Sequence, residues 1–456
     1  MKKFNPTETV CRDLWAYPVI DLTRPRVRTC CKRGGTLLNE HEINQYNTDV
    51  FLNLPGTIDD RALMLDGIRP DNCKVCWDLE DAGSKSFRQD YLDFQYHFNN
   101  INGVPPHFTE FRSFEQLVEV KETILHSNKP NKLDLSLGTY CDQKCVYCNS
   151  DYSSQWEAED KKYGLIDGDP AAPLPVNYPS INSQSLAGWT ELFFTWFDTV
   201  YEHLERIALL GGEPTISPMF IPLSKHIVNS LKIKSHSNCT FSIVTNLNWK
   251  KNILDHVYWI RRELPPTVTL VLEVSMESVG IRAEYIRHGI NWDRFLYNLK
   301  SVASLDNVEI KLIITLNALC ITSIKEYFEL IKIIELDNDK SFKIIVNRVV
   351  FPKWLSTDIL DSNFKPFVYD FIQWLEIYND GSKDEILVAM REVLIELDTP
   401  RDQNLIGYFL KCIDAIDKRR GINFRNIFPE FDYLFNTYNQ YSTQMFSTLC
   451  TKKWYL

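Results

Sequence analysis

The stretch Leu133-Asp-Leu-Ser-Leu-Gly-Thr-Tyr-Cys-Asp-Gln-Lys-Cys-Val-Tyr-Cys-Asn-Ser150 joins a short strand pattern to a run of cysteines. Its alternating leucines predict a half-buried strand that ends at Gly138. The loop that follows carries Cys141, Cys145 and Cys148 in a Cys-x3-Cys-x2-Cys spacing. Three thiolates this close in sequence can converge on one soft metal centre. Structural zinc usually takes four protein ligands, whereas an iron–sulfur cubane held by three cysteines leaves one iron open to another ligand.

Downstream of this loop, helical and strand patterns alternate. Near-continuous apolar strands separated by helices are typical of a parallel sheet covered on both faces. Together with the strand at Leu133, they make six βα units, and chemistry in barrels of this kind gathers at the C-terminal ends of the strands. The expected strands lie near 207–210, 240–246, 267–275, 308–316 and 343–350, and the expected helices include 187–205 and 218–232.

Polar or glycine-rich residues follow three of these strands, namely Gly211-Gly212-Glu213-Pro214, Thr245 with Asn246, and Ser275 with Glu277. The two glycines leave the backbone bare for close approach of a ligand, and exposed carbonyls together with Glu213 can receive an ammonium group. The alternative for each motif is an ordinary strand-to-helix turn, because small polar residues are common turn formers.

The Cys-x3-Cys-x2-Cys loop, with Gly-Gly-Glu-Pro in register after it, resembles the radical S-adenosylmethionine (SAM) superfamily over about residues 132–350. The resemblance implies a partial (β/α)6 TIM-like barrel and a 4Fe-4S cluster held by Cys141, Cys145 and Cys148. In that family the open iron binds the amino and carboxylate groups of SAM. One electron then cleaves SAM to methionine and a 5′-deoxyadenosyl radical, which removes a hydrogen atom from the substrate.

The same resemblance implies a set of contacts to SAM. Tyr147 matches the aromatic position that packs on the adenine, and Arg287, in Tyr285-Ile-Arg287-His288-Gly289, is the candidate for the SAM carboxylate. The alternatives are a core tyrosine and a surface arginine in a capping turn, and His288 is either a titrating or a structural histidine. The remaining implied contacts are Gly211, Gly212, Glu213, Thr245, Asn246, Ser275 and Glu277.

The N-terminal region carries a second group of cysteines. Three motifs are similar to the auxiliary-cluster modules called SPASM or twitch domains: Cys-x3-Trp at Cys11, Val27-Arg-Thr-Cys-Cys, and Gly67-Ile-Arg-Pro-Asp-Asn-Cys-Lys-Val-Cys76. By this match Cys11, Cys30, Cys73 and Cys76 would hold a second 4Fe-4S cluster, with Cys31 as the alternative to Cys30.

Two features of this region depart from the usual pattern. Such modules usually follow the radical domain, and here the motifs precede it. Arg24-Pro25-Arg26 also replaces the usual Asp-Gly turn. The same four cysteines would satisfy a structural zinc site, and the sequence does not separate the two metals.

Composition sets the background for these motifs. Of the 456 residues, 44% are hydrophobic and 24% charged, and the net charge of −10 argues against a dominant phosphate-binding surface. Nucleic acid is therefore not an expected partner. The chain has neither a signal-peptide pattern nor an apolar run of membrane-spanning length, and its twelve cysteines sit in short clustered spacings. We expect a cytoplasmic protein that binds metals rather than forming disulfides.

Four regions are expected along the chain: an auxiliary-cluster domain (1–105), a linker (106–131) with a charged helix at about 113–127, the radical SAM barrel (132–352), and a helical, aromatic-rich C-terminal region (353–456). Thr57 is expected to cap a helix at 58–65, and Ser323 with Glu326, and Ser382 with Glu385, to form capping boxes. Residues 15–22 and 27–30 are expected to be strand-like. The polar stretch 151–185 is either a lid over the cluster or a passive surface insertion.

These features predict an enzyme that cleaves SAM reductively and abstracts hydrogen from a peptide or protein side chain. The peptide class is an analogy with family members that carry auxiliary clusters. A low-potential electron donor such as flavodoxin or ferredoxin is the expected second partner. The alternatives are a radical SAM enzyme acting on a small molecule or nucleotide, and a non-catalytic iron–sulfur or zinc protein that binds a partner or senses redox state.

Overall fold

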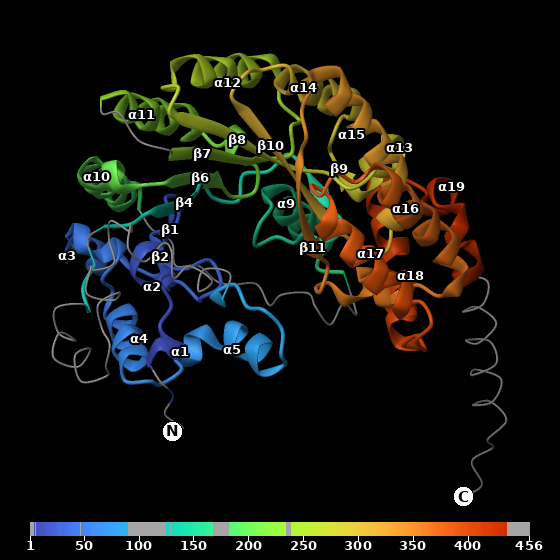
Figure 1. Cartoon of the computed structure of the whole chain (residues 1–456), viewed down its shortest axis with the longest axis horizontal. Helices are drawn as coiled ribbons and strands as arrows, with labels where there is room; N and C mark the ends of the chain where they lie inside the picture. The colour runs from blue at the N-terminus through green and yellow to red at the C-terminus, as the bar shows by residue number, and fades with distance from the viewer. Residues whose placement is uncertain are drawn as a thin grey trace, which may run out of the picture. The chain divides into compact units, whose positions relative to one another are not determined.

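A computed structural model describes Phe4 and residues 6–45, 47–89, 125–127, 129–166, 182–233 and 239–435 (Figure 1). Most of the helix expected at 113–127, residues 167–181 of the polar stretch, and the aromatic residues beyond 435 lie outside this set. The described part of the polar stretch is not irregular throughout, because residues Ser154–Tyr163 form helix α9.

The described strands lie in the order β11-β10-β8-β7-β6-β4-β1-β2-β3, and β5 and β9 form a separate two-stranded ladder. The pairs β1–β4, β4–β6, β6–β7 and β10–β11 are parallel, whereas β1–β2, β2–β3 and β5–β9 are antiparallel. The bounds are β1 Pro18–Asp21, β2 Arg26–Thr29, β3 Thr36–Leu37, β4 Lys132–Ser136, β5 Lys144–Cys145, β6 Arg206–Leu210, β7 Cys239–Thr245, β8 Val268–Ser275, β9 Arg287–His288, β10 Val308–Leu316 and β11 Lys343–Arg348.

The sheet confirms the prediction of an α/β fold. Strands β4, β6, β7, β8, β10 and β11 are neighbours in chain order, which is the order of a partial (β/α)6 barrel. Their buried apolar residues explain the pattern, since β8 buries six of its eight residues and β10 alternates buried and half-buried positions. The helices between these strands are α9, α10 (Ser183–Val200), α11 (Phe220–Ile233), α12 (Lys251–Glu263), α13 (Gly280–Ile286), α14 (Trp292–Ala303) and α15 (Ile324–Asn338).

Contacts divide the chain into two compact units, of which the first comprises residues 1–138, 177–244 and 255–271. Its N-terminal part packs Leu14, Trp15, Met64 and Trp77 into one core. The side chain of Arg61 is fully buried in this part and donates hydrogen bonds to three backbone carbonyls, those of Leu14, Leu52 and Leu125. The helices are α1 (Pro6–Thr9), α2 (Asp13–Ala16), α3 (Glu40–Gln45), α4 (Pro55–Leu65) and α5 (Lys74–Asp81).

Two local predictions for this region are wrong. Trp15 lies in α2 rather than in a strand, because its ring fills the core from a short helix that precedes β1. Helix α4 begins at Pro55 with Leu54 at the cap position, so Thr57 lies inside the helix, where its hydroxyl accepts a hydrogen bond from Arg33.

The second unit comprises residues 139–176, 245–254 and 272–456. It ends in helices that confirm the predicted helical C-terminal region: α16 (Lys365–Tyr378), α17 (Asp384–Glu396), α18 (Gln403–Arg420) and α19 (Phe424–Ile427). Figure 1 shows them gathered near β11, in orange and red. Helix α17 packs on β11, where the backbone N–H of Val346 donates to the Glu385 carboxylate at 2.7 Å.

Both predicted capping boxes in this unit are wrong, because the side chains have tertiary partners instead. Ser323 makes no cap hydrogen bond, and its hydroxyl lies 2.6 Å from that of Ser278. Lys383, not Ser382, occupies the cap position of α17. The Lys383 ammonium is buried and lies 3.0 Å from the Glu335 carboxylate, which also accepts the backbone N–H of Phe342 at 2.6 Å.

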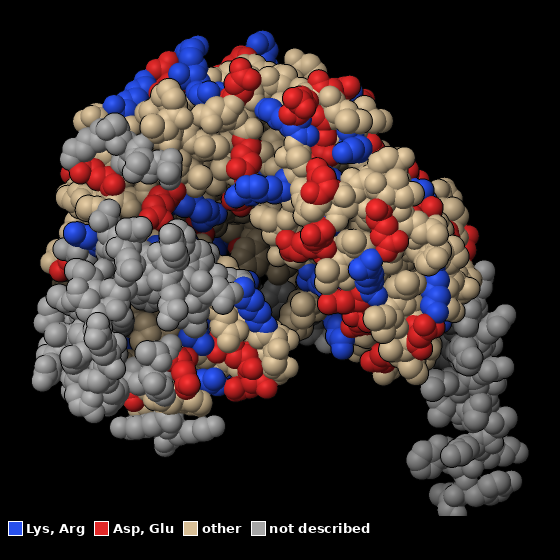
Figure 2. All heavy atoms as spheres, in the orientation of Figure 1, with Lys and Arg blue, Asp and Glu red and all other residues tan. Residues whose placement is uncertain are grey.

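Acidic and basic side chains are interspersed on the face drawn in Figure 2. On this face, the part of the chain that the structure describes therefore shows no surface of a single charge sign. None of the described helices is both long enough and apolar enough to cross a membrane.

Candidate functional site

The cysteine loop is held in the second unit by a small antiparallel ladder and by helix α9. Strand β5 pairs Cys145 with Arg287 and Lys144 with His288. The Cys145 carbonyl accepts two N–H groups, one from the backbone of Cys148 at 2.9 Å and one from the Trp156 indole at 2.8 Å. These bonds fix the backbone between the second and third cysteines before any ligand is bound.

The three thiols of the loop are shielded from solvent to different degrees. Cys141 is buried, and Cys145 and Cys148 are half-buried. Burial raises the pKa of the Cys145 thiol, and burial together with the neighbouring Cys145 raises that of Cys148 to about 12. Without a metal, Cys145 and Cys148 are therefore neutral thiols, and a bound metal centre would have to displace their protons.

A buried ion pair lies directly behind this loop. Arg287 donates to the Glu277 carboxylate through Nε at 3.1 Å and through Nη2 at 2.6 Å. The Tyr147 hydroxyl donates to the same carboxylate at 3.1 Å, and the guanidinium lies 5.6 Å from the centre of the Tyr147 ring. Both charged side chains are at most 5% exposed. The remaining nitrogen, Nη1, lies 4.0 Å from the Cys145 sulfur.

The structure therefore brings four of the predicted site residues into direct contact: Cys145, Tyr147, Glu277 and Arg287. Glu277 already binds the guanidinium that was predicted to receive the SAM carboxylate. A carboxylate reaching Arg287 would share the guanidinium with Glu277, through the Nη1 that Glu277 does not use. The pairing leaves no net charge buried behind the loop.

A second set of contacts ties the end of β7 to the cysteine loop. Asp142, between the first two cysteines, accepts hydrogen bonds from the side-chain amides of Asn246 at 2.8 Å and Asn248 at 2.7 Å. Thr245 turns inward, and its hydroxyl accepts the indole N–H of Trp249 at 2.9 Å. In this structure Thr245 and Asn246 thus shape the strand end, and their contact with SAM stays a prediction. Ser275 is the last residue of β8 and is half-buried.

In the first unit, the Gly-Gly-Glu-Pro element follows β6. Gly211 has φ +143°, and a Cβ atom there would lie 2.6 Å from the Gly138 carbonyl oxygen. The Gly212 N–H donates to the same oxygen at 2.9 Å. Glu213 is buried and caps the short helix Pro214–Ile216, where it accepts the Thr215 N–H at 3.3 Å. The absence of a side chain at Gly211 is thus a requirement of backbone packing.

Replacing Gly211 with alanine is expected to lower the free energy of unfolding by about 1–3 kcal/mol, the usual cost of a strained backbone position. The physical reason is the combined clash with the Gly138 carbonyl and the unfavourable φ. Gly188→Ala is the matched control, because Gly188 is an exposed residue inside α10 with nothing within 4 Å of its Cβ position. This control should gain up to about 1 kcal/mol. Urea denaturation measures both, and equal stabilities would contradict the expectation.

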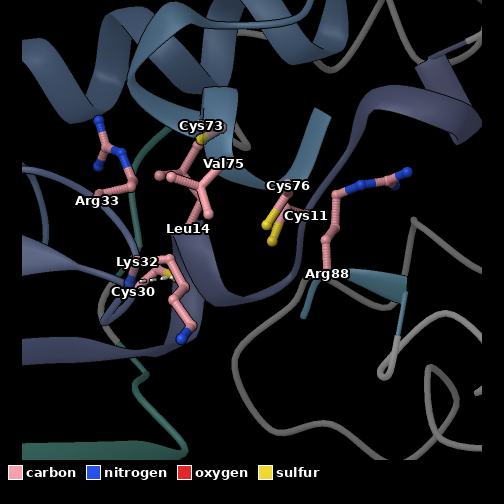
Figure 3. Close-up of a pocket in the computed structure, with 9 residues that line it drawn as sticks. All are labelled: Cys11, Leu14, Cys30, Lys32, Arg33, Cys73, Val75, Cys76 and Arg88. Carbon is pink, nitrogen blue, oxygen red and sulfur yellow. Dashed lines mark hydrogen bonds between the residues drawn. The ribbon is translucent and has the colours of Figure 1, made fainter. Parts of the chain in front are cut away.

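Four of the N-terminal cysteines line one pocket in the first unit. Figure 3 shows the pocket, with about 350 Å³ of atom-free space that includes space open to solvent. Cys31 is not among its lining residues, and of the two neighbouring cysteines it is Cys30 that faces this space. The lining residues are Cys11, Leu14, Cys30, Lys32, Arg33, Cys73, Val75, Cys76 and Arg88.

The charged side chains that line this pocket, among the described residues, are all cationic. They are Lys32, Arg33 and Arg88, and none of the described residues that line the pocket is acidic. Two of these cations are held from behind by buried acids, Arg33 by Asp60 and Arg88 by Glu80 at 2.6 Å. A group held by four thiolates is anionic, so cationic side chains around the pocket fit it electrostatically.

Cys11 and Cys73 of the pocket are protonated in the absence of metal. Burial raises the pKa of Cys11, and raises that of Cys73 to about 12. Cys30 has φ +75°, and its sulfur accepts the N–H of Lys32 at 3.4 Å. A hydrogen bond from Cys30 lowers the pKa of the neighbouring Cys31 to about 7.

In the part of the chain that the structure describes, no group of three or more His, Cys, Asp or Glu side chains is close enough together to hold a single metal ion. The ligands of a four-iron cluster lie further apart than those of one ion, because the cluster itself is larger. In chemical type, three thiols in the loop and four in the N-terminal pocket are donor sets that iron–sulfur clusters take.

Sequence reasoning missed Asp142, Trp156 and Asn248. Asp142 lies within the cysteine motif and Trp156 follows it by eight residues, but their role depends on tertiary partners that no local pattern reveals. The sequence does not decide whether His288 is a titrating or a structural residue. Burial lowers its pKa to about 4, so it is neutral at pH 7 and has a structural place in the β5–β9 ladder.

No family model matches the sequence, and no match to a curated protein is significant. Among solved structures, Streptococcus suis SuiB bound to S-adenosylmethionine is similar at 15% sequence identity, with 81% of this chain and 70% of that chain covered and a TM-score of 0.32.

Two further solved structures are similar to this chain. SuiB bound to precursor peptide SuiA is similar at 15% identity, with the same coverage and a TM-score of 0.34. Native anSMEcpe with bound AdoMet matches at 13% identity over 53% of this chain and 59% of that chain, with a TM-score of 0.32.

Proposed function

We propose that this chain is a radical SAM enzyme, which cleaves SAM reductively at a 4Fe-4S cluster and abstracts hydrogen from a peptide or protein side chain. The observation that carries the proposal is the cysteine loop backed by the buried Arg287–Glu277 pair. A loop that only needed a stable turn would not require a buried arginine directed at one of its cysteines.

Cys141, Cys145 and Cys148 would hold the cluster, which when bound supplies the electron that cleaves SAM. Arg287, through the Nη1 that Glu277 does not bind, would receive the SAM carboxylate, and Glu277 would hold the guanidinium in place. Tyr147 would pack on the adenine. The remaining proposed SAM contacts are Gly211, Gly212, Glu213, Thr245, Asn246 and Ser275.

Cys11, Cys30, Cys73 and Cys76 are proposed to hold a second 4Fe-4S cluster, and the cationic lining of their pocket supports this assignment. The peptide class of substrate extends the resemblance of the N-terminal motifs to auxiliary-cluster modules. A low-potential donor of the flavodoxin or ferredoxin type would supply the electron. The protein's own task is to hold SAM and to exclude water from a reactive carbon radical.

The test is the release of 5′-deoxyadenosine from anaerobically reconstituted, reduced protein supplied with SAM, together with metal analysis. We expect release by the wild type, none by Cys145→Ala, and undiminished release by Cys239→Ala. Cys239 is the matched control because it is a buried thiol in β7, outside both cysteine groups. The wild type should hold about eight iron atoms per chain, and Cys73→Ala about four.

The possible outcomes separate the alternatives. About four irons and one zinc per wild-type chain would replace the second cluster with a zinc site. An intact cluster with neither 5′-deoxyadenosine release nor SAM binding would overturn the proposal and indicate a non-catalytic iron–sulfur protein.

A further inference from the structure

The last residue of helix α18 reaches the helix that follows the cysteine loop. The side chain of Arg420 is fully buried, and its guanidinium lies 4.7 Å from the centre of the Trp156 ring. The indole N–H of Trp156 donates to the Cys145 carbonyl at 2.8 Å. Arg420 thus supports the side chain that holds the backbone of the middle cysteine.

The guanidinium of Arg420 has one acidic neighbour and few hydrogen bonds. Its Nε lies 3.5 Å from the Glu159 carboxylate, which the Lys144 ammonium also contacts. Nη1 and Nη2 are buried and have no hydrogen-bond partner among the described residues. A buried guanidinium with unused donors is costly for a protein to keep, and the cost falls when an anion lies nearby.

A cluster held by the thiolates of the cysteine loop would be such an anion. The Trp156 side chain contacts both the Arg420 guanidinium and the Cys145 carbonyl, so the buried cation lies one side chain away from this cysteine. Lys144 and Arg419 add positive charge here, so that three cations, including Arg420, face the two carboxylates of Glu159 and Asp160. The excess positive charge therefore lies on the side of the loop that α9 covers.

We propose that Arg420 is a positioning residue for the cluster at Cys145, which it stabilises in the reduced state by its buried charge while it holds Trp156 against the loop. This inference rests on the proposed function. Reduction adds one negative charge to the cluster, and a nearby buried cation lowers the free energy of the reduced form. The C-terminal region thereby contributes to the electron-transfer step without contacting SAM.

The test is an anaerobic redox titration with dithionite, in which the reduced cluster is detected by electron paramagnetic resonance. The signal that changes when SAM is added identifies the cluster at Cys145. For Arg420→Gln we expect the equilibrium constant for reduction of the cluster to fall at least tenfold. For a one-electron couple this lowers the reduction potential by about 59 mV. Arg420→Lys keeps the charge and should titrate close to the wild type. Arg419→Gln is the matched control, because Arg419 is the neighbouring cation that contacts Asp160 and Glu159 but not the Trp156 ring.

An unchanged potential in Arg420→Gln at full iron content would overturn the inference, and so would an equal fall in Arg419→Gln. Arg420→Met is a second neutral variant, which keeps an apolar chain over Trp156. Loss of iron from both neutral variants with retention by Arg420→Lys supports the inference, whereas loss from the lysine variant as well overturns it. A wild-type protein without any SAM-responsive signal would instead disprove the proposed function.

Discussion

Replacing Arg287 with methionine is expected to lower the free energy of unfolding of the metal-free chain by about 3–5 kcal/mol. The change leaves the Glu277 carboxylate fully buried, and Tyr147 is then its one remaining hydrogen-bond donor among the described residues. An unpaired charge in such surroundings loses its attraction to the guanidinium and keeps its desolvation cost. Urea denaturation of the metal-free variant and wild type measures the difference.

The double variant Arg287→Met/Glu277→Gln separates stability from function at this pair. The glutamine keeps an acceptor for Tyr147 and removes the buried charge, so most of the lost stability should return. SAM binding, measured by calorimetry on cluster-loaded protein, should be lost in both the single and the double variant. Both lack Arg287, the residue proposed to bind the SAM carboxylate. Recovery of SAM affinity in the double variant would show that Arg287 has only a structural role.

The second large effect is expected at Lys383, whose ammonium is fully buried against Glu335. Lys383→Met should also cost about 3–5 kcal/mol in unfolding free energy, for the same physical reason. Glu335 still accepts the Phe342 N–H, but one backbone donor does not neutralise a carboxylate.

Here the double variant should behave differently. Lys383→Met/Glu335→Gln is expected to recover most of the stability, with cluster content and SAM affinity equal to the wild type throughout. Arg391→Ala, which breaks an ion pair between two half-exposed side chains, serves as the control and should cost at most about 1 kcal/mol. A fall in SAM affinity in the Lys383 variants would mean that this pair is coupled to the site.

Much of the fold could be predicted because its signals are local. Each parallel strand is an apolar run that a helix follows, and burial on both faces of a sheet imposes that pattern. The observed β10, Val308–Leu316, matches its expected range. Helix caps were less predictable. Ser323 and Ser382 each precede a helix and could have capped it, but their hydroxyls bind Ser278 and Asp380 instead.

The candidate site shows the same division between local and tertiary information. The spacing of Cys141, Cys145 and Cys148 is visible in the sequence. The ion pair between Arg287 and Glu277 is not visible in the sequence. The two residues lie ten positions apart on either side of a helix and meet only when β9 pairs with the loop. Arg420 is more than two hundred residues from Cys145, and no periodicity links them.

The Glu385 carboxylate on the backbone of β11 has a consequence for association between copies of the chain. Among the described residues β11 has a single strand neighbour, β10, so its other side is an open edge. Unpaired N–H groups on such an edge are a template for a strand of another molecule. By binding the Val346 N–H, Glu385 occupies one of those groups and places a negative charge beside it. Aggregation through this edge would have to displace that carboxylate first, which gives α17 a protective role during expression and concentration of the protein.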